Sequence, residues 1–432
     1  MAAPRPEPRS VGRIGVVGLG YVGLPLAAAF AEAGFSVVGV DNDPGKIAAL
    51  ASGASYVEGV GADRLRPLIN AGSARFTEDH ADLGEAEAVI VCLPTPLTKN
   101  KEPDLSALLS GIRAVARNLE PGALVVLESS TYPGSTREVV LPILEEGGRR
   151  VGEDFNLAYS PERIDPGNKT YNLKNTPKLV GGITPECTVR ARELYARIVE
   201  EVFEVPSPEV AEMTKLLENV FRSVNIALVN ELAIICRRMD IDVWKVVEAA
   251  ATKPFGFMSF SPGPGLGGHC IPVDPFYLSW RARAFDSVAA FVELAGRVNV
   301  GMPHYATNRI TSALNAEKKP LNGSRVLMLG ISYKPNIGDI RESPSLKIME
   351  LLVKSGAEVI YHDPHVPHLP QHGLSSVELT KQELWRSDCV VIATDHDAVD
   401  VRLVVDVAPK IVDLRNVVRG RLGELPDNVE VL

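Results

Sequence analysis

The sequence predicts an α/β protein with two Rossmann-like, doubly wound parallel-sheet domains joined by a helical region. Short apolar runs alternate with helical segments over residues 13–205, and the same alternation returns after residue 318. Between them, a helical stretch that starts at Glu209 continues for about 29 residues without Gly or Pro. Strand–helix alternation at this spacing is typical of a parallel sheet with helices on both faces.

The elements of the first domain are marked by apolar runs and by helix-capping residues. The strand signals are, in order, RIGVVG, SVVGVD, AVIVCLP and ALVVLESST. Helix starts follow at Tyr21, Asp43, Asp104 and Thr184. Three of these residues are Asp or Thr, which commonly cap helix N-termini. The first helix should end at Ala33, because Gly34 occupies the position where a left-handed residue often closes a helix.

The long central helix is more apolar than most surface helices. Its apolar residues repeat at helical spacing and few charges interrupt its middle, so we expect it to be buried between subunits or domains. In the last part of the chain, the runs SRVLMLG, AEVIYHD, DCVVIATD and KIVDLR are strand signals. Ser343 and Pro344 mark a helix between the first two of these strands.

Length and composition place the chain among ordinary globular proteins. The 432 residues are too many for one compact domain. We expect a tail (1–12), a first α/β domain (13–205), a helical centre (206–318) and a second α/β domain (319–432). The first ten residues lack an apolar core for a signal peptide, and five scattered cysteines favour a cytoplasmic protein. We found no uninterrupted apolar run near membrane-spanning length, and a net charge of −9 gives no reason to expect nucleic acid or an anionic membrane as a partner.

A glycine-rich turn predicts an NAD site. Gly18, Gly20 and Gly23 form GxGxxG directly after a strand and before a helix, a context that is typical of dinucleotide binding. The helix N-terminus supplies amide donors to a pyrophosphate. Asp41 ends the next strand, where a carboxylate accepts from the ribose hydroxyls and repels a 2′-phosphate. The alternative is a Gly-rich turn that binds no nucleotide. The residues expected to hold NAD here are Gly18, Gly20, Tyr21, Val22, Gly23 and Asp41.

One cysteine has the surroundings of a reactive thiol. Cys270 lies in GPGLGGHCIPVD, where glycines allow backbone to approach a ligand closely. A thiolate adds to an aldehyde, the adduct gives hydride to NAD, and the resulting thioester is hydrolysed. Because Gly/Pro loops are common, the motif alone leaves a structural role open. We expect no metal site, since the cysteines form no CxxC pair.

Several charged residues near predicted strand ends or on the long helix are candidate site residues. Lys215 and Asn219 lie four apart and share a helix face, where the lysine is either a surface residue or a buried functional cation. Glu162 and Arg163 follow a strand end, as does Thr131. In the last domain, Lys334 and Arg341 are candidate diphosphate contacts, with ordinary surface charge as the alternative.

Seven segments in order resemble the UDP-glucose/UDP-N-acetylhexosamine dehydrogenase family. They are GLGYVGLPLA, VCLPTPL, ESSTYPG, YSPERIDPG, EMTKLLEN, GPGLGGHCIPVD and GISYKPNIGDIRESP, spread over residues 13–430. The resemblance implies an NAD-binding domain, a helical dimer-forming centre and a nucleotide-sugar domain. It also implies a UDP-sugar substrate and a homodimer or higher homo-oligomer.

The resemblance assigns a role to each catalytic candidate. Cys270 matches the catalytic thiol, and Lys215 with Asn219 match the groups that stabilise the substrate oxygen. Asp274 and Thr131 match the pair that positions a water for proton removal, and Glu162 matches the glutamate of thioester hydrolysis. Further cofactor contacts implied are Pro94, Thr95, Thr131 and Arg341. The implied substrate contacts are Glu162, Arg163, Lys215, Asn219, Gly267, Gly268 and Lys334.

The segment around Glu162 is the basis of the substrate prediction. UDP-glucose members of the family carry a second glutamate at the position of Pro166, so SPERxxPG resembles the branch that acts on UDP-N-acetylglucosamine. UDP-N-acetylmannosamine is a near alternative, and UDP-GalNAc and UDP-glucose are further ones. Two other classes remain: a single-step β-hydroxyacid dehydrogenase, which needs neither Cys270 nor residues 320–432, and an inactive NAD- or UDP-sugar-binding protein.

Overall fold

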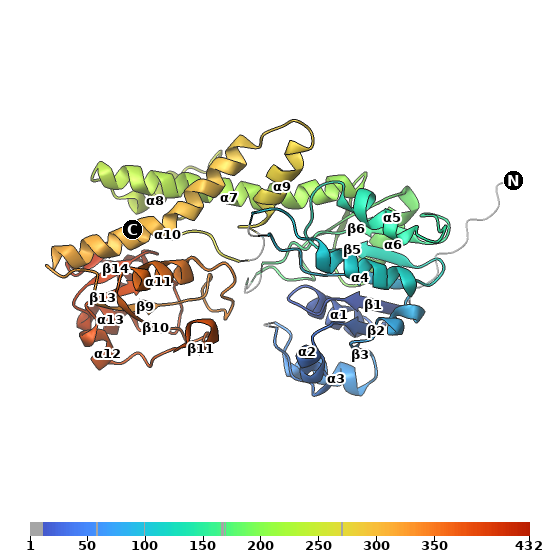
Figure 1. The fold of residues 1–432 in the computed structure, drawn as a ribbon, viewed down its shortest axis with the longest axis horizontal. Helices are drawn as coiled ribbons and strands as arrows, with labels where there is room; N and C mark the ends of the chain where they lie inside the picture. The colour runs from blue at the N-terminus through green and yellow to red at the C-terminus, as the bar shows by residue number, and fades with distance from the viewer. Residues whose placement is uncertain (1–11, 58, 99, 166–167, 169, 269–270) are drawn as a thin grey trace. The chain divides into compact units, whose positions relative to one another are not determined.

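The chain forms two compact units (Figure 1). The computed structural model describes residues 12–57, 59–98, 100–165, 168, 170–268 and 271–432. The first unit runs to Glu218 and includes Phe276–Ser287. The second unit comprises Asn219–Pro275 and Val288–Leu432.

The first unit is built on an eight-stranded sheet with the order β3-β2-β1-β4-β5-β6-β7-β8. Its strands are β1 (Arg13–Val17), β2 (Ser36–Val40), β3 (Ala74–Thr77), β4 (Ala88–Val91), β5 (Leu124–Leu127), β6 (Asn156–Tyr159), β7 (Lys178–Gly182) and β8 (Val202–Glu204). Neighbouring strands pair in parallel except β6 and β7, which are antiparallel. The polarity change at β7 is a feature that strand–helix alternation did not predict.

Helices cover both faces of this sheet. They are α1 (Gly23–Glu32), α2 (Pro44–Ala51), α3 (Ala62–Asn70), α4 (Ser106–Arg117), α5 (Leu141–Leu144) and α6 (Pro185–Tyr195). Successive side chains of a strand point to opposite faces. Val126 of β5 accordingly packs in the core that contains α1 and α6, while Val125 packs in the core that contains α4 and α5. The strands are therefore apolar on both faces, as a doubly wound sheet requires.

Four helices make up the centre of the chain: α7 (Pro208–Arg238), α8 (Val243–Ala251), α9 (Asp274–Arg283) and α10 (Ala290–Ala316). Helix α7 has 31 residues, close to the predicted length. By length and composition alone it is apolar enough to cross a membrane, and 39% of its most apolar window is buried. From the sequence we expected no apolar segment of membrane-spanning length, and α7 departs from that expectation. A single such helix is weak evidence for a membrane, since helices of globular proteins have the same composition.

The second unit has a five-stranded, all-parallel sheet with the order β10-β9-β13-β14-β15. Its strands are β9 (Arg325–Leu329), β10 (Glu358–His362), β13 (Cys389–Ile392), β14 (Ile411–Asp413) and β15 (Val429–Val431), and β11 (His368–Leu369) pairs with β12 (Leu374–Ser375). One face packs on α10 and α11 (Pro344–Lys354). The other packs on α12 (Lys381–Arg386), α13 (Val401–Val407) and α14 (Val417–Leu422).

The fold confirms the predicted class of two parallel-sheet domains joined by long central helices. The caps predicted at Asp43, Thr184 and Ser343 are present, and each side chain accepts from a backbone amide of the first turn. The cap predicted at Asp104 is displaced by one residue. Helix α4 begins after Leu105, although the Asp104 carboxylate still accepts from Ser106 N.

Candidate active site

The glycine-rich turn between β1 and α1 has the geometry of a pyrophosphate-binding loop. Gly18 has a φ of +91°, and a Cβ there would lie 2.5 Å from the carbonyl oxygen of Cys92. A Cβ on Gly23 would lie 1.8 Å from the carbonyl oxygen of Gly18. At Gly20 a Cβ meets nothing within 4 Å. Two of the glycines are therefore required by packing, and the third leaves open space where a phosphate group approaches the backbone.

The first turn of α1 offers amide donors to an anion. Val22 is the N-cap residue, and no side chain in the described part of the chain caps this helix. Tyr21, just before it, is 40% exposed. Because the helix N-terminus carries a partial positive charge, these positions suit a pyrophosphate.

Asp41 at the end of β2 is organised to receive a ribose. Its buried carboxylate accepts from Leu19 N at 2.9 Å and from Asp43 N at 3.0 Å. Lys46 Nζ lies 3.0 Å from Asp41 Oδ2. A carboxylate has about four acceptor positions, and these three donors leave about one for a ribose hydroxyl. These residues fit the dinucleotide predicted from sequence.

The loops after β4 and β5 lie together. Thr95 Oγ1 donates to the carbonyl of Ser130 at 2.6 Å, and Tyr277 Oη donates to the carbonyl of Thr95 at 3.0 Å. Pro94 is exposed beside them. Thr131 Oγ1 is buried, and no described residue pairs with it. A buried hydroxyl without a protein partner is an expected contact for a water or a ligand.

Glu162 and Lys215 meet in the first unit. The Nζ of Lys215, on α7, donates to the backbone carbonyl of Glu162 at 2.5 Å. Lys215 is only 8% exposed, which excludes the surface interpretation left open by the sequence. A cavity of about 480 Å³ is lined by Glu162, Tyr21 and Val22 among other residues. The predicted hydrolytic glutamate and the pyrophosphate loop therefore border one cavity of a size suited to a small molecule.

Arg163 is held by the protein itself. Its Nη2 lies 2.7 Å from Glu218 Oε1, and its Nη1 donates to the carbonyl of Pro177 at 2.8 Å. Its predicted role as a substrate contact would have to use the remaining donor capacity of the guanidinium.

A buried ion pair beneath Glu162 was missed by the sequence analysis. Lys178 Nζ lies 2.7 Å from Glu128 Oε2 and 3.5 Å from Glu162 Oε2, and Tyr195 donates to the other oxygen of Glu128. Burial lowers the pKa of Lys178, but Glu128 and Glu162 outweigh burial and hold that pKa above its ordinary value. Lys178 is 50 residues from Glu128, so no local motif could have paired them.

The loop that carries Thr131 is anchored by a second missed residue, Glu212 of α7. Its buried carboxylate accepts from Gly134 N at 2.6 Å and from Thr136 N at 2.9 Å. It also accepts from the hydroxyls of Ser135 and Thr136 at 2.8 and 2.7 Å. A signal was present in the sequence, because Glu212 lies three residues before Lys215 and therefore near the same helix face.

In the second unit, Asn219 and Asp274 meet. Asn219 Nδ2 donates to Asp274 Oδ2 at 2.5 Å, and both residues are buried. The two side chains, which the sequence assigned to different roles, are thus hydrogen-bonded across 55 residues of sequence. Cys270, four residues before Asp274, lies outside the described residues.

The glycines near Cys270 pack on the loop that carries Lys334. A Cβ on Gly267 would lie 2.3 Å from Tyr333 Cβ, and Gly268 N donates to the carbonyl of Arg341 at 3.0 Å. Lys334 is partly exposed on this loop. Arg341 pairs with Asp339, whose Oδ2 accepts from its Nη2 at 2.6 Å.

Arg415 is a third residue that the sequence analysis missed. It follows β14, its Nε donates to the carbonyl of Ala393 at 3.0 Å, and a Cβ on Gly263 would lie 2.6 Å from its Nη1. Burial lowers the pKa of Arg415 to about 10, against the opposing effect of Asp395 and Asp413, so the guanidinium remains cationic at neutral pH. Its position directly after the strand KIVDL was the available sequence signal.

The predicted residues thus fall into two groups, one in each unit. The first unit holds Gly18, Gly20, Tyr21, Val22, Gly23, Asp41, Pro94, Thr95, Thr131, Glu162, Arg163 and Lys215. The second unit holds Asn219, Gly267, Gly268, Asp274, Lys334 and Arg341.

Three family models match almost the whole chain. Residues 12–199 match the NAD binding domain of the UDP-glucose/GDP-mannose dehydrogenase family, residues 209–300 its central domain, and residues 327–420 its UDP binding domain. The first match confirms the predicted NAD-binding domain.

Curated proteins and solved structures are similar over nearly the full length. A UDP-N-acetyl-D-glucosamine 6-dehydrogenase of Pseudomonas aeruginosa is 37% identical, over 89% of this chain and 90% of its own. An NDP-N-acetyl-D-galactosaminuronic acid dehydrogenase of Ralstonia nicotianae is 35% identical, over 91% and 95%. The solved structure of a UDP-D-ManNAc dehydrogenase from Pyrococcus horikoshii is 34% identical with a TM-score of 0.88, over 97% and 98%.

Proposed function

Because the chain belongs to the UDP-glucose/GDP-mannose dehydrogenase family, we propose that it oxidises the C6 alcohol of UDP-N-acetylglucosamine to a carboxylate. The family membership establishes NAD-dependent oxidation of a UDP-sugar at C6. The choice of sugar is the proposal. The overall reaction converts UDP-N-acetylglucosamine, two NAD⁺ and one water into UDP-N-acetylglucosaminuronate and two NADH.

The observation that carries the proposed mechanism is the contact of Lys215 Nζ with the carbonyl of Glu162, a residue that lines one cavity with Tyr21 and Val22. NAD, held by the glycine-rich turn and Asp41, supplies the hydride acceptor in both oxidation steps. The buried ammonium of Lys215, with the amide of Asn219, stabilises negative charge on the substrate oxygen. We assign Thr131 and Asp274 the positioning of the water that takes the hydroxyl proton.

The second oxidation depends on Cys270. Its thiolate adds to the aldehyde carbon, and the second oxidation then leaves a thioester on the sulfur. Water cleaves the thioester, which releases the carboxylate and restores the thiol. Glu162 assists this hydrolysis, since the residue lines the cavity and Lys178 Nζ lies 3.5 Å from its carboxylate. Capture on the sulfur keeps the reactive aldehyde on the protein.

The diphosphate is proposed to bind through Lys334 and Arg415 of the second unit, with Gly267 and Gly268 giving close backbone approach. We also propose that Arg163 contacts the substrate and that Arg341 contacts the cofactor, as predicted from the sequence. A UDP binding domain at residues 327–420 supports this placement and argues against a single-step β-hydroxyacid dehydrogenase.

The sugar preference is supported by the segment around Glu162 rather than by overall identity. Relatives named for N-acetylglucosamine, N-acetylgalactosaminuronic acid and N-acetylmannosamine are 34–37% identical to this chain, a range too narrow to choose among them. Pro166, at the position of the second glutamate of UDP-glucose members, favours an N-acetylhexosamine. UDP-N-acetylmannosamine is the second candidate.

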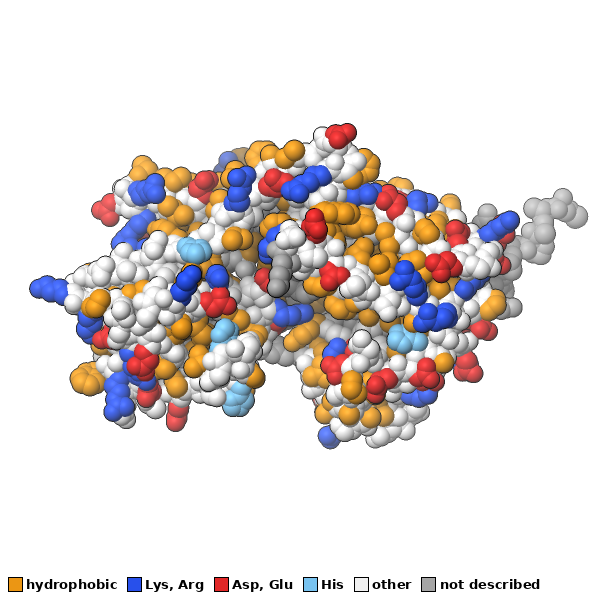
Figure 2. Space-filling view, in the orientation of Figure 1, with side chains coloured by type: hydrophobic (Ala, Val, Ile, Leu, Met, Phe, Trp, Pro, Cys, Tyr) orange, Lys and Arg blue, Asp and Glu red, His pale blue; other side chains and the backbone are white. Residues whose placement is uncertain are grey.

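We propose that the protein is a cytoplasmic homodimer. Exposed apolar residues recur every three, four or seven positions along α7 and form a stripe that a second copy would bury. They are Val210, Met213, Leu217, Phe221, Leu228, Leu232 and Ile235. Hydrophobic side chains also reach the surface over the helices at the upper edge of Figure 2. Cys92, Cys187, Cys236 and Cys389 are free thiols, which agrees with a reducing compartment.

The test is the NADH yield per limiting UDP-sugar, measured for UDP-N-acetylglucosamine, UDP-N-acetylmannosamine, UDP-N-acetylgalactosamine and UDP-glucose. We expect two NADH per UDP-N-acetylglucosamine, with turnover lost or severely slowed in Cys270→Ser. Cys236→Ser, a buried cysteine of α7, is the matched control and should keep wild-type turnover. One NADH per sugar at a rate independent of Cys270 would contradict the thioester route. Turnover of another UDP-sugar alone would retain the chemistry and overturn the substrate proposal.

A further inference from the structure

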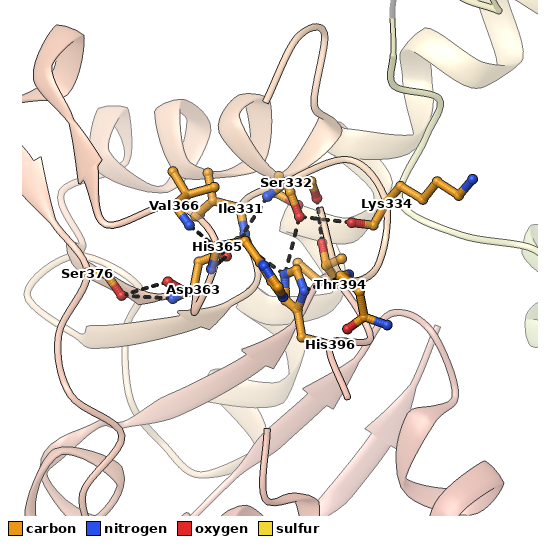
Figure 3. A network of polar contacts seen from close by, with 12 residues as sticks. Ile331, Ser332, Lys334, Asp363, His365, Val366, Ser376, Thr394 and His396 are labelled. Atoms are coloured by element: carbon orange, nitrogen blue, oxygen red, sulfur yellow. Dashed lines mark hydrogen bonds and ion pairs between the residues drawn. The ribbon is translucent and has the colours of Figure 1, made fainter. Parts of the chain in front are cut away.

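A polar network in the second unit is centred on a buried histidine (Figure 3). His396 follows β13 and is fully buried. Its Nε2 lies 3.1 Å from Asp363 Oδ2, after β10, and 3.2 Å from Ser332 Oγ, after β9. Its Nδ1 accepts from Asn336 N at 3.0 Å. One ring therefore connects the carboxyl ends of three neighbouring strands, the edge where parallel sheets bind ligands.

The hydrogen bonds of His396 define its protonation state. A backbone N–H only donates, so Nδ1 must carry a lone pair toward Asn336. The ring proton then resides on Nε2 and is donated to Asp363. Burial raises the pKa of Asp363, but the hydrogen bonds from His396 and from the amide of Ile331 outweigh burial and bring the pKa to about 2. His396 is thus a neutral ring between an anionic acceptor and an amide donor.

This arrangement is not a nucleophilic triad. In such a triad the histidine uses one ring nitrogen for the nucleophile and the other for the carboxylate. Ser332 and Asp363 both face Nε2, and Nδ1 is occupied by Asn336. The network therefore holds structure and has no means of activating Ser332.

What the network holds is the backbone on both sides of Lys334. Ser332 Oγ donates to the carbonyl of Lys334 at 3.0 Å, and Thr394 Oγ1 donates to the carbonyl of Ser332 at 2.6 Å. On the other side, Asn336 has a left-handed φ of +61° and exchanges two hydrogen bonds of 2.9 Å with Asp397. Figure 3 shows the Lys334 side chain extending away from the network.

We infer that His396 is a positioning residue for the UDP diphosphate: the acceptor at Nδ1 and the donor at Nε2 hold the Lys334 loop in its binding geometry. The inference rests on the proposed function, in which Lys334 contacts the diphosphate. Without the acceptor at Nδ1, the Asn336 N–H would lose its partner and the loop would lose the contact that closes it. Removal of that acceptor should therefore lower UDP-sugar affinity.

The charged and titratable groups around His396 are known from each neighbouring element. Asp363 and His365 face the ring from the segment after β10, with the two imidazole centroids 5.0 Å apart. Asp395 and Asp397 flank it in sequence. From α14, Arg421 donates to the backbone carbonyl of His396 at 2.9 Å and pairs with Asp395. Asn336 N at Nδ1 and Ser332 Oγ at Nε2 both connect the ring to the Lys334 loop.

Two substitutions separate the two nitrogens of His396. His396→Asn retains an acceptor near the position of Nδ1, whereas His396→Gln retains a donor near Nε2 and removes the acceptor. The measurement is the Kd of UDP-N-acetylglucosamine for each full-length protein, determined by calorimetry without NAD at neutral pH.

The expected pattern differs for the three proteins. His396→Gln should bind UDP-N-acetylglucosamine about 10-fold more weakly than the wild type, whereas His396→Asn should stay near the wild-type affinity. In turnover assays the loss in His396→Gln appears mainly in KM. Equal weakening by Asn and Gln would reduce His396 to a packing role and overturn the inference. If His396→Gln does not fold, weakened binding of UDP-N-acetylglucosamine by folded His396→Asn overturns the inference instead.

A double substitution distinguishes failure of this inference from failure of the proposed function. If His396 acts through Lys334, the variant Lys334→Met/His396→Gln binds no more weakly than Lys334→Met. Unchanged affinity in Lys334→Met would refute the proposed diphosphate contact itself. Weakened affinity in Lys334→Met with wild-type affinity in His396→Gln would leave the proposed contact intact and refute the role of His396.

Discussion

At the scale of single residues, Asp41 combines two tasks. Its carboxylate holds the glycine-rich turn through Leu19 N, and its charge disfavours a 2′-phosphate at the ribose position. Lys46, with its Nζ 3.0 Å away, balances that charge. Preference for NAD therefore depends on a carboxylate that has a cation directly beside it.

The substitution Asp41→Ser should expose Lys46 to the cofactor. We expect the ratio of kcat/KM with NADP to that with NAD to rise about 10- to 100-fold, because a 2′-phosphate would pair with Lys46 instead of meeting a carboxylate. Activity with NAD should fall, since the turn loses its acceptor. Steady-state kinetics with both cofactors measure the ratio.

Two further variants control this experiment. Asp43→Asn, which removes the charge of the helix-cap residue but retains its acceptor for Gly45 N, should leave the ratio unchanged. Asp41→Ser/Lys46→Met should return the ratio toward the wild-type value. An NADP gain that survives in the double variant would show that Lys46 is not responsible.

A second feature at the scale of single residues is the buried ion pair of Lys178 and Glu128. Removing one member of a buried pair leaves an uncompensated charge and costs about 3–5 kcal/mol. Lys178→Met should therefore lower the free energy of unfolding strongly, whereas Lys178→Met/Glu128→Gln should recover much of it. Because Glu162 loses its partner in both, we expect kcat to fall about 10- to 100-fold even in the stable double variant. Urea titration measures the unfolding free energy, and kcat is measured on the same preparations. A wild-type kcat in the double variant would refute the positioning of Glu162 by Lys178.

At the scale of helices and strands, the sequence predicts features that depend on neighbouring residues. It does not predict pairings between residues that are far apart in the chain. Helix starts at Asp43, Thr184 and Ser343 could be predicted, because a cap is satisfied by amides two or three residues away. The antiparallel pairing of β7 could not, since it depends on a strand about 20 residues earlier and on no turn motif. The same holds for Lys178 and Glu128, whose partners are fixed only once β5 and β7 lie in one sheet.

The residues of the candidate site were predictable or not for the same reason. Residues in the glycine-rich turn were predictable because Gly18 and Gly23 are required by local packing and Gly20 keeps the backbone accessible. Lys215 was ambiguous, because helical spacing gives its face and not its burial. Arg415 and Glu212 were missed because their importance comes from neighbours that are distant in sequence, namely Gly263 and the Gly134–Thr136 turn.

Glu212 offers a test of how one helix positions the Thr131 loop. Glu212→Gln places an amide NH₂ where Gly134 N–H now donates, so we expect a loss of roughly 1–3 kcal/mol in unfolding free energy and a lower kcat. Glu209→Gln on the same helix is the matched control. It weakens a partly exposed pair with Arg137 and should cost less than about 1 kcal/mol with little change in kcat. Equal kcat values for the two variants would contradict a positioning role for Glu212.

At the scale of the whole molecule, α7 carries proposed site residues of both units. The helix belongs to the first unit up to Glu218 and to the second from Asn219 onward. Lys215 and Asn219, one turn apart, thus belong to different units while sharing a helix. The same helix carries the exposed apolar stripe, so any partner that covers the stripe would also constrain these two residues. The proposed homodimer should therefore affect turnover, which can be measured.

The substitution Leu228→Asp tests the stripe directly. Leu228 is 52% exposed in the single chain, and burying an unpaired carboxylate in an apolar dimer interface is unfavourable by several kcal/mol. We expect sedimentation velocity to give a dimer for the wild type and a monomer for Leu228→Asp, with turnover reduced in the monomer. Trp385→Asp on α12, where the exposed tryptophan lies away from α7 in sequence, should remain a dimer. A wild-type mass retained by Leu228→Asp would exclude the stripe as the interface, and retained turnover in a true monomer would show that α7 positions Lys215 and Asn219 without a second copy.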